Sequence, residues 1–173
     1  SGDLDEFRIA DLLQAGAPID GFGVGGNLAI GLGSLASGAI GGVLGAVYKL
    51  VWYEGAGTQA RIKLAGSKST WPGRKMVYRI GDYEEDVLQL DDEPAPPGGV
   101  ALLAGVIRQG AIRDVTLPPL EIQGRAAANL HALPAKYRAL REPAPYPVRR
   151  SDRLLSLREE ASAAWADAAG TLP

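Results

Sequence analysis

Residues 1–26, SGDLDEFRIADLLQAGAPIDGFGVGG, favour a helix between two strands. Asp3 stands three residues before Glu6, which is the spacing of a helix-capping box. The apolar residues that follow recur at helical spacing: Ile9, Leu12 and Leu13. We therefore expect a helix from Leu4 to about Ala15, with Asp3 as its N-cap and its apolar stripe packed on a sheet.

Glycines stand at the ends of both expected strands. One strand is cut short at Ser1 and Gly2, and the other runs over 19–24 and ends in Gly25 and Gly26. Parallel strands joined by a helix emerge at the same carboxyl edge of a sheet, where α/β barrels carry their active sites. Backbone N–H groups at two such glycine tips can face one anion. The alternative is that the glycines only make tight turns.

The length, net charge and composition of the chain exclude several classes of protein. With 173 residues and a net charge of −2, it offers no basic field for nucleic acid. It has no cysteine, so it forms no disulfide or thiolate metal site, which suits a cytoplasmic protein. No signal peptide is visible at the start. Because the first residue is Ser1 and the first strand is truncated, we expect a fragment.

The glycine-rich stretch 21–48 carries no charged residue. Its length and its small-xxx-small spacings would permit a glycine-zipper membrane helix. Glycine is a poor helix former, however, and Asn27, Ser34 and Ser37 dilute the apolarity. We therefore favour a glycine-rich loop and keep the membrane protein as an alternative.

The rest of the chain changes from a β-rich to a helical pattern. The expected strands lie at 47–53, 61–64, 75–80, 87–90 and 100–107, with the first two in a hairpin and the last one buried. The expected helices lie at 122–133, 135–140 and 151–169, and Ser151 caps the last of them. Paired carboxylates at Asp91–Glu93 can bind Mg²⁺, but an exposed acidic loop fits the proline-rich stretch that follows.

Five blocks of the sequence resemble the carboxyl-terminal part of the nicotinate phosphoribosyltransferase family. They are SGDLDEFRI (1–9), GAPIDGFGVGG (16–26), GAVYKLVWYEG (45–55), KSTWPGRKMVYR (68–79) and LREPAPYPVRRSDRL (140–154). The resemblance implies an α/β fold in three segments. Residues 1–45 would be the last βαβ portion of an α/β barrel, 46–116 a β-rich segment, and 117–173 a helical tail.

The resemblance also implies a reaction. The intact enzyme would join nicotinate to phosphoribosyl pyrophosphate, giving nicotinate mononucleotide and pyrophosphate in NAD salvage, with ATP hydrolysis and Mg²⁺. It would be a cytoplasmic homodimer. The blocks VYKL (47–50) and TWPGRK (70–75) favour nicotinate as the base. Nicotinamide or quinolinate stays an alternative, because the base pocket that would decide is expected upstream of Ser1.

Site residues follow from the same resemblance. Gly2, Gly25 and Gly26 would hold the 5′-phosphate, and Asp3 would accept hydrogen bonds from the ribose hydroxyls. Family members usually carry Thr where this chain has Gly26, so any contact there must come from the backbone. The blocks around Lys49 and Arg74 make these two residues possible phosphate contacts.

No catalytic residue is predicted within the chain. Its one histidine, His131, lies in the helical tail and is expected to be structural or to face solvent. No Ser/His/Asp set or metal-ligand cluster is visible. We therefore expect the isolated chain to be inactive, and a non-catalytic phosphate-binding module is the alternative to part of an enzyme.

Overall fold

The computed structural model describes residues 2, 4–29, 48–55, 57–64, 69–113 and 117–170. The chain divides into two compact units. Unit 1 is Ser1–Tyr48 with Leu140–Glu142, and unit 2 is Lys49–Ala139 with Pro143–Pro173. Helices and strands are both present, so the expected α/β class is confirmed at this level. The described strands form open sheets, and the α/β barrel stays a prediction.

Unit 1 contains helix α1 (Glu6–Gln14) and a single helical turn, α2 (Gly26–Ala29). The Asp5 side chain accepts a hydrogen bond from the Arg8 N–H at 2.7 Å and caps α1. The helix ends at Gln14, and Gly16, which follows the C-cap residue Ala15, has a left-handed φ of +70°. Here the N–H of Gly16 reaches the Leu13 carbonyl and the N–H of Ala17 reaches that of Leu12, as in a Schellman motif.

Two expectations for this region are wrong. The cap of α1 is Asp5, not Asp3, because the helix begins at Glu6. Residues 19–24 do not form a strand, and no described segment pairs with them. A strand persists only where a neighbour takes its backbone hydrogen bonds. The βαβ repeat is therefore not formed among the described residues.

The apolar stripe of α1 is present but only partly covered. Ile9 and Leu12 are half-buried, and 54% of Leu13 is exposed. Arg141 adds a link within unit 1, since its guanidinium pairs with Asp11 at 3.0 Å and lies 5.5 Å from the ring centroid of Phe7. The expected packing of this stripe on a sheet is not seen among the described residues.

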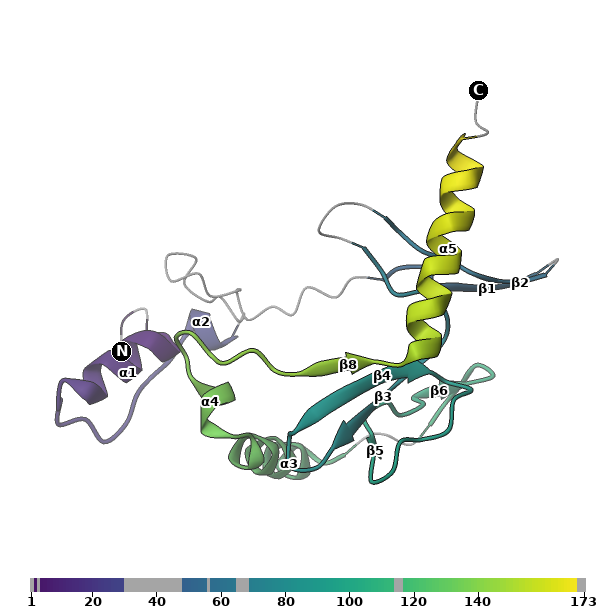
Figure 1. Cartoon of the computed structure of the whole chain (residues 1–173). Helices are drawn as coiled ribbons and strands as arrows, with labels where there is room; N and C mark the ends of the chain where they lie inside the picture. Colours follow the sequence, from purple (N-terminus) through teal and green to yellow (C-terminus); the bar gives the residue numbers. More distant parts are fainter. Residues whose placement is uncertain are drawn as a thin grey trace. The chain divides into compact units, whose positions relative to one another are not determined.

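Unit 2 is built on a four-stranded sheet with the order β5-β3-β4-β8 (Figure 1). Strands β3 (Lys75–Ile80) and β4 (Glu85–Leu90) pair antiparallel, and this confirms the two strands predicted at 75–80 and 87–90. Strand β8 (Val148–Arg150) lies parallel to β4, and the short β5 (Val100–Ala101) lies antiparallel to β3.

Two small hairpins complete the β structure. The first joins β1 (Trp52–Gly55) to β2 (Gly57–Ala60), so a hairpin is present in this region, but the strand predicted at 61–64 is wrong because β2 ends at Ala60. The second joins β6 (Ile107–Arg108) to β7 (Ala111–Ile112). The buried strand predicted at 100–107 is wrong, because only its ends are extended and these ends are exposed.

The predicted helices are confirmed. They are α3 (Pro119–Ala132), α4 (Ala135–Arg138) and α5 (Asp152–Gly170). Helix α3 begins earlier than the pattern suggested, since Pro119 suits the first helical position. None of the described helices is long and apolar enough to cross a membrane. The membrane alternative depended mainly on residues 30–47, which lie outside the described residues.

The core of unit 2 lies where α5 meets the end of β4. Val87, Leu90 and Leu154 are buried there. The Ser151 hydroxyl accepts from the Leu154 N–H at 3.2 Å and donates to the Glu93 carboxylate at 2.7 Å. The predicted cap is thus confirmed. Glu93 is half-buried, whereas Asp91 and Asp92 are exposed. The expected exposure of the acidic loop is therefore confirmed only for its first two residues.

Candidate functional site

The segments that follow the two glycine tips are joined by a hydrogen bond. The Asn27 side-chain amide nitrogen, Nδ2, donates to the main-chain carbonyl oxygen of Leu4 at 3.0 Å. Leu4 is buried, with 7% of its surface exposed, and stands two residues after Gly2. Asn27 directly follows Gly26. The structure therefore joins the segments that follow the two predicted tips, and among the described residues no strand ends at either tip.

The glycine tip at 25–26 is open. A Cβ atom added at Gly25 or Gly26 would meet no described atom within 4 Å. Of the three predicted phosphate-binding glycines only Gly2, with φ +117°, has a left-handed backbone. Neither crowding nor backbone conformation among the described residues thus requires glycine at 25 and 26. Among the described residues, nothing hinders the close approach of another molecule to the main chain at this point.

The backbone at this tip is also ordered locally. The Gly25 carbonyl accepts hydrogen bonds from the N–H groups of Leu28 at 3.1 Å and Ala29 at 3.0 Å. The leading N–H groups of a helical turn have no partner inside the turn, and here they belong to Gly26 and Asn27. Asp3, the predicted ribose ligand, lies outside the described residues.

Lys49 and Arg74 belong to unit 2, whereas the glycine tips belong to unit 1. Lys49 is exposed. The Val51 carbonyl accepts from the Gly73 N–H at 2.8 Å, which places the segments that carry these two residues side by side. The structure thus brings the segments of Lys49 and Arg74 together within their own unit.

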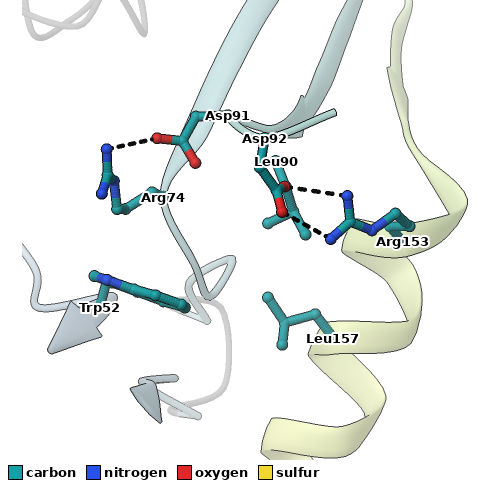
Figure 2. Close-up of a pocket in the computed structure, with 7 residues that line it drawn as sticks. All are labelled: Trp52, Arg74, Leu90, Asp91, Asp92, Arg153 and Leu157. Atoms are coloured by element: carbon teal, nitrogen blue, oxygen red, sulfur yellow. Dashed lines mark hydrogen bonds and ion pairs between the residues drawn. The ribbon is translucent and has the colours of Figure 1, made fainter. Parts of the chain in front are cut away.

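Arg74 lines a hollow of about 310 Å³ that Figure 2 shows from close by. The lining residues are Trp52, Arg74, Leu90, Asp91, Asp92, Arg153 and Leu157. Arg74 pairs with Asp91 at 2.9 Å, and Arg153 pairs with Asp92 at 3.0 Å. The hydrogen bond from Arg153 lowers the pKa of Asp92 below its ordinary value. Each guanidinium is therefore neutralised by a neighbouring carboxylate, and a phosphate at Arg74 would compete with Asp91.

Lys75 has a role that the sequence reasoning missed. Its ammonium group, Nζ, donates to the carbonyl oxygens of Trp71 at 2.7 Å and Pro72 at 3.4 Å, and also to that of Gly73. Burial lowers the pKa of Lys75. Since these carbonyls belong to the turn before β3, Lys75 stabilises the turn that presents Arg74. The sequence pattern that could have indicated this role is the turn pair Pro72-Gly73 just before Lys75.

No metal site accompanies these features in the described ranges. There is no group of three His, Cys, Asp or Glu side chains placed to hold a metal ion within those ranges. His131 lies in the last turn of α3 and is exposed, which confirms the expectation for this residue.

Comparisons with known proteins give a consistent family relationship. No protein-family model matches the chain. It is 38% identical over 160 residues to nicotinate phosphoribosyltransferase pncB2 of Mycobacterium tuberculosis, covering 90% of this chain and 32% of that protein. It is 31% identical over 190 residues to nicotinate phosphoribosyltransferase of Bos taurus, covering 94% of this chain and 34% of that protein.

A solved structure agrees with these sequences. The fold matches human nicotinic acid phosphoribosyltransferase with a TM-score of 0.51 and 30% identity, over 67% of this chain and 26% of that one. The chain spans about a third of the length of the curated relatives that it matches. Over nine-tenths of its own length, the chain is therefore related by sequence to the nicotinate phosphoribosyltransferases.

Proposed function

We propose that this chain forms the carboxyl-terminal part of a nicotinate phosphoribosyltransferase, in which residues 1–45 complete an α/β barrel. The complete enzyme would convert nicotinate and phosphoribosyl pyrophosphate into nicotinate mononucleotide and pyrophosphate. Relatives of this name match nearly the whole chain at 30% identity or more, which supports the proposal. A cytoplasmic homodimer belongs to the same proposal.

The proposed role of this chain is to hold the 5′-phosphate of the ribosyl group. Main-chain N–H groups at Gly2, Gly25 and Gly26 would donate to the phosphate oxygens, and Asp3 would accept from the ribose hydroxyls. The observation that carries this role is the hydrogen bond from Asn27 to Leu4, beside an open glycine tip. A side chain at Gly25 or Gly26 would occupy the space that the phosphate needs.

In this reaction the protein needs to supply little covalent chemistry. As pyrophosphate leaves, positive charge develops at the ribosyl carbon, and the enzyme must fix both phosphate ends and stabilise the changing charge. The glycine tips would fix one of these ends. The base pocket would come from residues outside this chain.

ATP and Mg²⁺ are part of the proposal only through the family resemblance. In the ranges that the structure describes, no cluster of carboxylates is arranged for Mg²⁺, so these residues do not fit a metal site. Phosphate binding by main-chain N–H groups needs neither of these groups.

Titration with ribose 5-phosphate tests the proposed phosphate site. We expect saturable binding by residues 1–173 that is lost in Gly25→Val, because the added side chain blocks the approach to the main chain. Gly105→Val is the matched control, since a Cβ at Gly105 also meets no described atom within 4 Å. Equal binding by both variants would refute the phosphate site.

A turnover assay tests whether residues 1–173 are active without the rest of the proposed enzyme. We expect purified residues 1–173 to form no nicotinate mononucleotide, because the proposed base pocket lies elsewhere. Turnover by this chain, with mass spectrometry excluding a longer form, would contradict the assignment.

A further inference from the structure

The Asn27 side chain makes a long-range contact that involves none of the main-chain N–H groups proposed to bind the phosphate. Its side chain joins two stretches of main chain that are 23 residues apart in sequence. Leu4, which accepts the bond, precedes the cap of α1, and Asn27 lies within α2. The bond is partly buried, so water competes with it less than at an exposed site.

Each end of this bond is itself held in place. On one side, the Asp5 carboxylate binds the Arg8 N–H at 2.7 Å and fixes the main chain directly after Leu4. On the other side, the Gly25 carbonyl binds the N–H of Ala29 at 3.0 Å and fixes the turn that contains Asn27. A bond between two locally fixed segments sets the separation of the main chain on both sides.

We propose that Asn27 is a positioning residue that holds the two glycine tips at the separation at which they receive one phosphate. This inference rests on the proposed function, which supplies the phosphate. In this role the Asn27 side chain acts through the Leu4 carbonyl, to which its amide nitrogen donates, and not through contact with the ligand.

The chemistry of the amide explains why asparagine serves here. The Leu4 carbonyl needs a donor, and the Asn27 amide supplies one without adding charge. Aspartate in its place would have the same shape but would offer only acceptors to the carbonyl. Alanine would leave the carbonyl without this donor and would allow the two tips to move apart. Binding would then include the cost of ordering them.

The experiment compares Asn27→Ala with a matched control, Asn129→Ala. Asn129 is the other asparagine of the chain and lies in α3 of unit 2, where its carbonyl accepts from Tyr83 whatever its side chain is. Two measurements are made on residues 1–173. One is the affinity for ribose 5-phosphate, and the other is the set of amide resonances of Gly2, Leu4 and Gly25 without ligand.

We expect Asn27→Ala to weaken the binding of ribose 5-phosphate about five- to tenfold, as for the loss of one hydrogen bond. The amide resonances of both tips should shift, and the side-chain NH₂ signal of Asn27 in the wild type should exchange slowly. Asn129→Ala should change none of these. If Asn27→Ala does not fold, Asn27→Asp replaces it with the same expected losses.

Three results decide the inference. Unchanged affinity together with unchanged tip resonances in Asn27→Ala would overturn it. If the wild type itself does not bind ribose 5-phosphate, the proposed phosphate site fails, and the resonances alone judge the link. Shifts at both tips would then show only that the Asn27 side chain joins the two segments, and the positioning role would be overturned together with the phosphate site.

Discussion

Gly73 gives the sharpest stability test because the structure requires glycine there for two separate reasons. Its φ of +82° is left-handed, a conformation that costs other residues roughly 1–2 kcal/mol. A Cβ atom would also lie 2.8 Å from the terminal methyl carbons of both Leu90 and Leu157. Overpacking of this kind costs about 1–3 kcal/mol. Gly73→Ala should therefore lower the free energy of unfolding by about 2–5 kcal/mol.

Gly98 separates the two causes. Its φ of +71° is similar, but a Cβ there meets no described atom within 4 Å. Gly98→Ala should lower the free energy of unfolding only by the backbone cost of about 1–2 kcal/mol. The difference between the two variants thus measures the packing of the turn against α5 and β4.

Urea unfolding followed by tryptophan fluorescence measures both variants, because Trp71 lies two residues before Gly73. The unfolding midpoint should fall further for Gly73→Ala than for Gly98→Ala, with an unchanged dependence on urea. If the two variants lose the same free energy, the turn is not packed against Leu90 and Leu157, and the reasoning is refuted.

Three further predictions concern polar contacts of unit 2. Asp86→Ala should lower the free energy of unfolding by about 2–3 kcal/mol, because the half-buried guanidinium of Arg79 loses the carboxylate that lies 2.9 Å from it. A loss below about 0.5 kcal/mol in urea unfolding would contradict this prediction. Ser151→Ala should cost about 1 kcal/mol through loss of the α5 cap, and circular dichroism during thermal unfolding measures it. Arg153→Gln should raise the pKa of Asp92 toward its ordinary value of 3.8, and an NMR titration of the carboxyl group measures this change. Because the pKa of Asp92 is lowered in the folded state, the pair stabilises the fold at pH values above 3.8. This stabilisation is lost as the pH falls through the pKa of the folded state.

The predictions that held rest on short-range patterns. Strands β3 and β4 were predicted from their local composition, and they pair with each other, so each supplies the partner that the other needs. Helix α5 was predicted with its cap because Ser151 and the Leu154 N–H lie within one turn. Helix–coil and hairpin preferences of this kind are set by neighbours along the chain.

The predictions that failed needed a partner from elsewhere in the fold. Residues 19–24 are apolar enough for a buried strand, but no described strand accepts their hydrogen bonds. Val100 begins a strand that ends after two residues, and 64% of its surface is exposed. The cap of α1 failed for a different reason, because Asp3 and Asp5 both suit a cap and only the observed bond to Arg8 chooses between them.

The sequence by itself determined the family relationship, the mixture of helices and strands, and the glycines at which a phosphate is expected. Only the tertiary structure decided that Asn27 binds the Leu4 carbonyl, that Lys75 stabilises the turn before β3, and that Arg74 is paired with Asp91. The physical reason is the same each time. A side-chain hydrogen bond or ion pair depends on which main-chain or charged group folding brings within about 3 Å, and the residue's identity specifies only that it can donate.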